Sequence, residues 1–147
     1  MPTTFMRLGF EEKTLRPDAL RALVLETGPV GFTLDVGLNY YRGMPLSSIE
    51  TFELVVDGER IADELILFEY NDKLFPPDQI PLAFTEFWSV KKDLRVNVYN
   101  GGLQPGRHTV ELTLHLRNVY MMFAPGVWGM IDGSLTRELE LTEGDAR

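Results

Sequence analysis

The sequence predicts an all-β fold, an antiparallel β-sandwich or jelly-roll-like structure that forms a single domain over residues 1–147. The first observation is an alternation of apolar and polar residues with a period of two, which is typical of strands that bury one face. The second is the turn signals between these segments, because several short strands separated by turns are typical of sandwiches and barrels. The third is the length, since one domain commonly has about 100–200 residues.

The first third of the chain carries the least regular pattern. Residues 16–23 are compatible with a short helix, because proline is favoured in a first helical turn and Pro17 stands there. The continuation over residues 22–26, which ends at Gly28-Pro29, fits a buried strand equally well. A clear strand follows, with an inward face made of Phe32, Leu34, Val36 and Leu38.

The rest of the chain repeats the strand pattern. Residues 52–56 alternate up to a hairpin turn at Asp57-Gly58, where glycine tolerates the positive φ that such turns require. Residues 94–98 and 135–141 alternate in the same way, and residues 110–116 do so most clearly. We expect the buried face of these strands to include Leu34, Val36, Leu54, Val96, Leu112, Leu114 and Leu139.

The composition limits the classes of partner. The formal net charge is −8 at pH 7, so nucleic acid and anionic membranes would be repelled rather than bound. No apolar stretch reaches the roughly 18 residues of a membrane-spanning helix, and the first residues lack the pattern of a signal peptide. The chain has no cysteine, which excludes disulfides and thiolate metal sites. We therefore expect a cytoplasmic protein.

Residues suited to metal or nucleophilic catalysis are scarce. The two histidines, His108 and His115, lie seven positions apart on one predicted strand, so they face opposite sides and cannot share a metal ion. No Gly-x-Ser-x-Gly motif and no glycine-rich phosphate loop are present. Most acidic residues fall on the outer faces of strands, where solvation explains them. We expect no catalytic residue, metal site or cofactor in this chain.

Three segments carry more large apolar side chains than an ordinary connection or alternating strand needs. Residues 38–50 join two predicted strands, and binding residues are common on loops that a rigid scaffold holds. Residues 118–133 contain the consecutive side chains Tyr120–Phe123, which one face of a strand cannot hide. They predict a strand buried on both faces, a plug under a loop, or an exposed patch for a partner. For residues 82–89 we expect core packing, because Phe84 alternates with polar neighbours.

The first of these segments also carries a family resemblance. The run Tyr40-Tyr41-Arg42-Gly43-Met44-Pro45-Leu46-Ser47, followed by Ile49-Glu50, resembles the signature of the small β subunits of bacterial C-glycoside deglycosidases. The Val56-Asp57-Gly58 and Pro105-Gly106-x-His108 turns match as well, although many bacterial sandwiches use the second. The resemblance extends over most of the chain and rests mainly on the tyrosine–arginine run.

This resemblance implies a β-sandwich subunit that assembles with a larger, barrel-shaped α subunit similar to sugar isomerases and epimerases. It implies that the α subunit holds the acid/base residues and a divalent metal ion, which we expect to be manganese. The complex would cleave the carbon–carbon bond between a 3-oxo sugar and an aromatic aglycone such as a flavonoid, with this chain shaping the active-site entrance at the subunit interface. We expect the wall that meets partner or substrate to include Tyr40, Tyr41, Arg42, Met44, Tyr120, Met122, Phe123 and Trp128.

Other functions and roles stay open at this point. A free-standing carbohydrate- or phenol-binding sandwich would use Tyr40, Tyr41 and Trp128 as stacking platforms. A self-sufficient small hydrolase would need polar residues that converge in a pocket. Two roles are also open for Arg42: it staples its own loop, against a backbone carbonyl or Glu50, or it reaches across to the active-site mouth of the partner.

Overall fold

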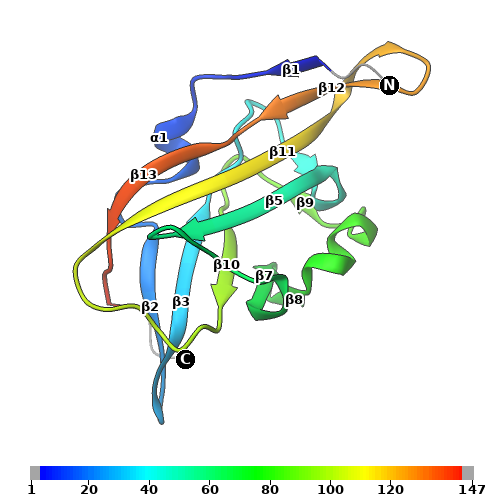
Figure 1. Cartoon of the computed structure of the whole chain (residues 1–147). Coiled ribbons are helices and arrows are strands. Elements are labelled where there is room, and N and C mark those ends of the chain that lie inside the picture. The colour runs from blue at the N-terminus through cyan, green and yellow to red at the C-terminus, as the bar shows by residue number, and fades with distance from the viewer. Residues whose placement is uncertain (1–3, 144–147) are drawn as a thin grey trace.

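The computed structural model describes residues 4–143, apart from the side chains of Thr4, Met122, Phe123 and Trp128. Most of these residues lie in two β-sheets (Figure 1). The six-stranded sheet contains β1 (Thr4–Met6), β5 (Ile49–Val56), β6 (Glu59–Arg60), β11 (Arg107–Ala124), β12 (Val127–Asp132) and β13 (Leu135–Glu140). The five-stranded sheet contains β2 (Leu20–Leu25), β3 (Gly28–Val36), β7 (Ile66–Tyr70), β8 (Lys73–Phe75) and β10 (Leu94–Val98).

Short elements connect or flank the sheets. A two-stranded pairing joins β4 (Met44–Pro45) to β9 (Phe87–Trp88). The helical turns are α1 (Glu11–Thr14) and the 3₁₀ segments η1 (Leu46–Ser48), η2 (Asp63–Leu65) and η3 (Pro77–Leu82).

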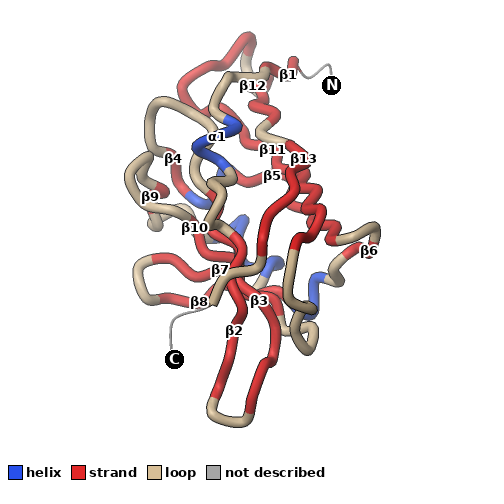
Figure 2. The backbone as a smooth tube through the Cα atoms, turned by 90° about the vertical axis from the view of Figure 1, so that its left-hand side faces the viewer, coloured by secondary structure: helices blue, strands red, loops and turns tan. Residues whose placement is uncertain are grey.

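The two sheets form the layers of a sandwich around one hydrophobic core (Figures 1 and 2). Phe52 of β5 meets Phe68 of β7 edge to face across the layers, with ring centroids 4.9 Å apart. All seven residues that the alternation assigns to the core are at most 2% exposed. The predicted all-β fold is therefore confirmed. One strand pair departs from the antiparallel pattern, because β1 runs parallel to β12.

The structure decides between the two alternatives that the sequence left open in the first third of the chain, in favour of a strand. Residues 16–23 form no helix, because α1 ends before them and β2 begins among them. The pairing of β2 with β3 sets Leu20 opposite Leu34, and both side chains are buried. Tertiary pairing therefore overrides the local helix signal of Pro17.

Strand β11 is the longest strand described, and it pairs with three other strands of its sheet. Its first part pairs with β5 and β13, and its second part pairs with β12. The register with β12 shifts between Asn118 and Met122, which marks a β-bulge. Beyond the bulge, the β11–β12 hairpin projects from the body of the sandwich (Figure 1). We call residues 119–128 of this hairpin the arm.

The two family-like turns lie against each other at one end of the six-stranded sheet. His108 is buried, and its Nδ1 lies 2.5 Å from the Asp57 carboxylate while its Nε2 lies 2.6 Å from the Gln104 carbonyl. The carbonyl and an ionised carboxylate both accept, so this geometry favours the imidazolium form of His108, in which both ring nitrogens donate. His115 packs instead against the ring of Phe5, with centroids 5.0 Å apart. The prediction that the two histidines face opposite sides of the strand is confirmed.

The hydrogen bond between Asp57 and His108 also shifts both titrations. It is the main reason that the pKa of Asp57 lies below its ordinary value. It is likewise the main reason that the pKa of His108 lies above its ordinary value, against an opposing effect of burial. The pair therefore stabilises the charged form of both partners.

The loop between β3 and β5 is fixed at several points although it contains little regular structure. The pairing of β4 with β9 holds its middle. The Leu46 N–H donates to the Glu86 carbonyl at 2.8 Å. The Ser47 N–H donates to the Ala83 carbonyl at 3.3 Å. Residues 39–45 therefore stand on a rigid base.

Candidate functional site

Three tyrosines form a layered cluster where this loop meets β11. Tyr40 is buried, whereas Tyr41 is 64% exposed. The ring centroids of Tyr40 and Tyr41 are 4.3 Å apart, and Tyr40 stacks on Tyr120 at 6.1 Å with an angle of 10° between the planes. Aromatic pairs favour such offset arrangements. The cluster therefore joins two segments that are far apart in sequence.

Asn118 holds this cluster together from inside the sheet. Its side chain is fully buried, and its Nδ2 donates to the Tyr40 hydroxyl at 3.3 Å. Its Oδ1 accepts from the backbone N–H of Tyr120 at 3.0 Å, at the bulge of β11. The Tyr40 hydroxyl is also 3.2 Å from that of Tyr41. One buried amide thus fixes both the bulge and the orientation of the tyrosines.

Arg42 rests on the ring of Tyr120. Its Cζ is 4.0 Å from the ring centroid, and the Tyr120 hydroxyl donates to the Gly43 carbonyl at 2.6 Å. Glu50 forms its ion pair with Arg117. The expectation that Arg42 could be stapled to Glu50 is therefore wrong, because Arg117 takes that carboxylate. The loop and the base of the arm instead clamp each other through Tyr120.

Gly43 allows β9 to approach the loop closely. A Cβ atom at this position would lie 2.3 Å from Cε2 of Phe87 and 2.9 Å from the Trp88 carbonyl oxygen. Real contacts of this kind are not that short, so a larger residue would push the two segments apart. Phe87 itself is 55% exposed. It therefore extends the surface that Tyr41 and Arg42 begin.

The site presents a neutral phenol beside a fixed positive charge. The pKa of Tyr41 lies above its ordinary value, chiefly because of the hydrogen bond with Tyr40, while the positive charge of Arg42 acts in the opposite direction. Tyr41 therefore stays protonated near neutral pH, and the guanidinium of Arg42 stays charged. Together they offer hydrogen-bond donors for oxygen atoms and a ring face for a sugar or an aromatic group.

Buried polar atoms without a hydrogen-bond partner gather near the same loop. Four side-chain atoms among the described residues are of this kind. Three of them are Asn39 Oδ1, Ser48 Oγ and Trp88 Nε1, which belong to the loop, η1 and β9. Native proteins satisfy nearly all such groups, so an exception calls for a specific explanation such as strain or a functional role.

The structure brings half of the expected wall together. The residues that meet in the cluster are Tyr40, Tyr41, Arg42 and Tyr120. Met44 is fully buried, because its pairing with β9 turns it into the core, so it is not part of an exposed wall. The side chains of Met122, Phe123 and Trp128 lie outside the described part of the structure.

Residues 82–89 contradict the expectation of core packing. Trp88 is buried, but Leu82 and Phe84 are each 71% exposed. The segment contains the end of η3 and the short β9 rather than one regular strand, so alternation around Phe84 does not report an inward face. The sequence signal against a buried strand here is the prolines at positions 76, 77 and 81, because proline is disfavoured in a central strand.

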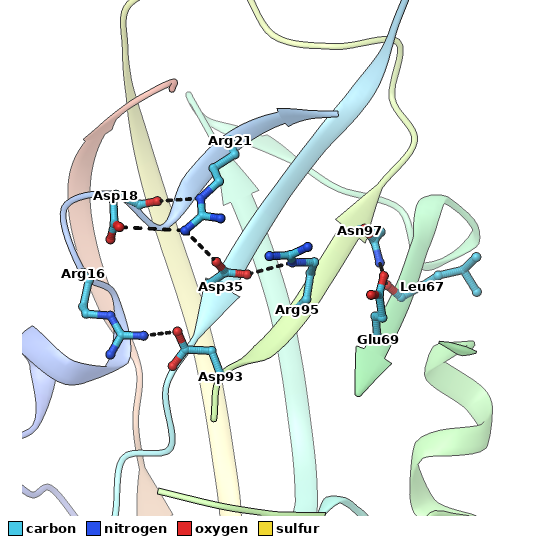
Figure 3. Close-up of polar contacts among 9 residues, drawn as sticks. All are labelled: Arg16, Asp18, Arg21, Asp35, Leu67, Glu69, Asp93, Arg95 and Asn97. Carbon is cyan, nitrogen blue, oxygen red and sulfur yellow. Dashed lines mark hydrogen bonds and ion pairs between the residues drawn. The ribbon is translucent and has the colours of Figure 1, made fainter. Parts of the chain in front are cut away.

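A separate polar cluster covers the outer face of the five-stranded sheet (Figure 3). Asp35 of β3 lies between Arg21 of β2 at 3.4 Å and Arg95 of β10 at 3.1 Å. Glu69 of β7 accepts from Nδ2 of Asn97 at 3.1 Å. A pocket of about 260 Å³ beside the cluster includes Asp35 and Arg95. Opposite charges alternate across four strands, an arrangement that stabilises the sheet, and the residues of the tyrosine cluster do not line this pocket.

The described residues contain neither a cluster of metal ligands nor a helix that could span a membrane. No group of three or more His, Cys, Asp or Glu side chains that could hold a metal ion occurs among them. No helix among them has the length and apolar character needed to cross a membrane.

The fold and the site together define a β-sandwich that presents an exposed aromatic surface on a loop held by the sheet, the kind of surface that usually marks an interaction site. The model of the C-glycoside deglycosidase beta subunit family matches residues 10–120. The chain belongs to this family, which confirms the family resemblance predicted from the sequence.

Relatives of this chain are likewise named as beta subunits of deglycosidases. The chain is 29% identical over 115 residues to the 3'-dehydrocarminate deglycosidase beta subunit of a Microbacterium species, covering 78% of this chain and 83% of the relative. It is 32% identical over 92 residues to the C-glycoside deglycosidase beta subunit of Eubacterium cellulosolvens, covering 62% and 63% of the two chains. A third relative, the C-glycoside deglycosidase beta subunit of Arthrobacter globiformis, is 28% identical over 66% of this chain and 75% of its own length.

Proposed function

We propose that this subunit assembles with a barrel-shaped α subunit, similar to sugar isomerases and epimerases, that supplies the acid/base residues and a divalent metal ion, which we expect to be manganese. The complex acts as a lyase on the carbon–carbon bond between a 3-oxo sugar and an aromatic aglycone such as a flavonoid. This chain contributes no catalytic residue and shapes the active-site entrance at the subunit interface. The cytoplasmic location expected from the sequence stays a prediction.

The observation that carries the proposal is the exposed pair Tyr41 and Arg42 on its rigid base. Both lie within the range that the family model matches. Tyr40 and Tyr120 hold them in place from below, so little conformational entropy is lost when another molecule binds. The names of the relatives support a partner, since a beta subunit works beside a subunit of another kind.

The chemistry of the pair suits an active-site mouth. The guanidinium of Arg42 can donate to a carbonyl oxygen of a 3-oxo sugar or to a carboxylate on the partner. The ring of Tyr41 can stack on an aromatic aglycone or on a side chain of the partner. Either contact would position substrate without taking part in bond cleavage.

The test compares Arg42→Ala and Tyr41→Ala with the wild-type chain. The probe is the isomerase-like barrel protein sought among the genes adjacent to this one. We expect each substitution to weaken the binding of the barrel protein to this chain, or to lower kcat/KM of the complex, by roughly tenfold or more, which is about 1.4 kcal/mol. The isolated Arg42→Ala chain should lose no more than about 1 kcal/mol of stability, the size of an exposed cation–π contact.

Two control variants remove similar side chains elsewhere. Arg60→Ala changes an exposed arginine of β6, and Tyr99→Ala changes a tyrosine that is 40% exposed just beyond β10. Each lies at the strand end opposite to the tyrosine cluster, and neither should affect assembly. Normal assembly and full activity of Arg42→Ala and Tyr41→Ala would remove the loop from the functional account. Binding of a free sugar or phenol by the chain without any partner would favour the binding-module alternative.

A further inference from the structure

We propose that residues 82–87 form a second docking surface for the α subunit, continuous with Tyr41 and Arg42. The inference rests on the proposed function, because it takes the α subunit as the occupant. Three large apolar side chains of the segment face solvent, with exposed fractions of 71% for Leu82, 71% for Phe84 and 55% for Phe87. A single exposed apolar residue is ordinary, but a cluster usually marks an interaction site.

The fold holds these side chains outward on a rigid segment. Between and beside them, Ala83, Glu86 and Trp88 are buried. The Glu86 carboxylate lies 2.9 Å from Nζ of Lys73 and 3.5 Å from Nδ2 of Asn71, and the bond from Lys73 is the main reason that its pKa is below the ordinary value. A paired, buried carboxylate fixes the segment from inside. The exposed apolar groups are thus preorganised, which lowers the entropic cost of docking.

The segment is continuous with the candidate site. The ring of Phe87 lies so close to Gly43 that a Cβ atom added to this glycine would be 2.3 Å from the ring. The carbonyl of the same Gly43 accepts from the Tyr120 hydroxyl at 2.6 Å. The contact from Phe87 through Gly43 to Tyr120 therefore joins residues 82–87 and the base of the arm into one surface, with Tyr41 and Arg42 beside it. In Figure 1 the green coil of η3 leads into β9 at this side of the sandwich.

Charge and family favour the α subunit over a second copy of this chain. The chain carries a net charge of −8, so two copies repel each other, whereas a partner of another composition need not. The relatives are named beta subunits, which points to a partner of a different kind. Phenylalanine and leucine side chains suit the water-free centre of an interface. Phe84 and Phe87 are therefore the side chains that we expect at the centre of the contact with the α subunit.

The test titrates the α subunit with the double variant Phe84→Ser/Phe87→Ser. We expect Kd to rise at least about tenfold, because truncated aromatic anchors dominate binding energy. The melting temperature of the variant should stay near that of wild type, because both side chains are exposed. Leu82→Ser is the second variant, in case the double variant unfolds. The matched control is Val24→Ser/Leu25→Ser, two residues each 41% exposed on the β2–β3 hairpin, which points away from η3 and β9 (Figures 1 and 2).

The outcomes separate this inference from the proposed function. Absence of binding by the wild-type chain would contradict the proposed function itself. Binding by wild type with an unchanged Kd for the Phe84 and Phe87 variant would overturn the second docking surface alone. A wild-type homodimer in sedimentation that the double variant loses would show a second copy as the occupant, which also overturns the inference. Weaker binding by the double variant with a normal Kd for the control supports it.

Discussion

Tyr120 shows how single residues combine the loop and the arm into one site. It stacks under Tyr40, carries the guanidinium of Arg42 and donates its hydroxyl to Gly43. The hydrogen bond to Gly43 spans 77 positions of sequence. The residue types of the loop indicated a binding function, but the identity of their support depends on tertiary packing.

At the same scale, the Asp57–His108 pair predicts a specific dependence of stability on pH. The ordinary pKa values are 3.8 for Asp57 and 6.5 for His108, and the fold lowers the first and raises the second. The stability that His108 contributes is complete below its unfolded pKa and is lost as the pH rises through the raised value. The contribution of Asp57 is present above its unfolded pKa and is lost as the pH falls through the lowered value.

We therefore expect Asp57→Asn to flatten the alkaline side of the stability profile. Urea midpoints measured from about pH 5 to pH 9 should fall less steeply for this variant than for wild type, because the main cause of the raised His108 pKa is gone. Asp132→Asn is the control, because it removes a carboxylate of β12 that lies near the other histidine, His115, on the opposite face of β11 from His108. Identical alkaline slopes for wild type and Asp57→Asn would show that the pair does not hold a charged histidine.

Among the elements, the central part of β11 carries the core of the six-stranded sheet. Leu112 is 2% exposed and lies opposite Leu54 of β5. We expect Leu112→Ala to lower the free energy of unfolding by about 2–5 kcal/mol, because it leaves a cavity. Thr113→Ala, on the opposite face, should change it by no more than about 0.5 kcal/mol. Equal effects of the two substitutions in a denaturant melt would mean that the inward face is misassigned.

The contact between the loop and β9 predicts a second effect at this scale. Gly43→Ala should destabilise the isolated chain by about 1–3 kcal/mol, because the new methyl group meets Phe87 and the Trp88 carbonyl. Gly9→Ala is the matched control, since nothing lies within 4 Å of a Cβ atom there. Thermal melts compare the two variants. An unchanged melting temperature for Gly43→Ala would show that the two segments approach less closely than described.

The strands that the sequence predicted are those with a regular period of two. Residues 94–98 and 110–116 lie in β10 and β11, with the expected faces inward. Other elements carry signals that a local pattern cannot interpret. Residues 20–25 form a strand because β3 pairs with them. Leu82, Phe84 and Phe87 face outward because the pairing with β4 and the buried Glu86 hold the opposite side of their segment. Pairing with distant strands decides both cases, and the local alternation of apolar and polar residues carries no information on that pairing.

For the molecule as a whole, the two surfaces that we propose would place docking on one side of the sandwich. The exposed residues of these surfaces are Tyr41, Arg42, Phe84 and Phe87. Arg42 rests on the ring of Tyr120, and Phe87 lies against Gly43. The polar cluster around Asp35 occupies the outer face of the other sheet (Figure 3). The chain therefore separates the sheet face that carries paired charges from the apolar surface that we assign to the partner.

The central claim is that this chain acts in a C-glycoside deglycosidase only together with an α subunit. The most direct measurement follows the cleavage of a 3-oxo-C-glycoside of an aromatic aglycone. The three samples are this chain, the α subunit and the mixture of the two, and all of them contain manganese. We predict turnover by the mixture, none by this chain, and far slower turnover by the α subunit without it. Turnover by this chain alone, or equal rates for the α subunit with and without it, would contradict the account.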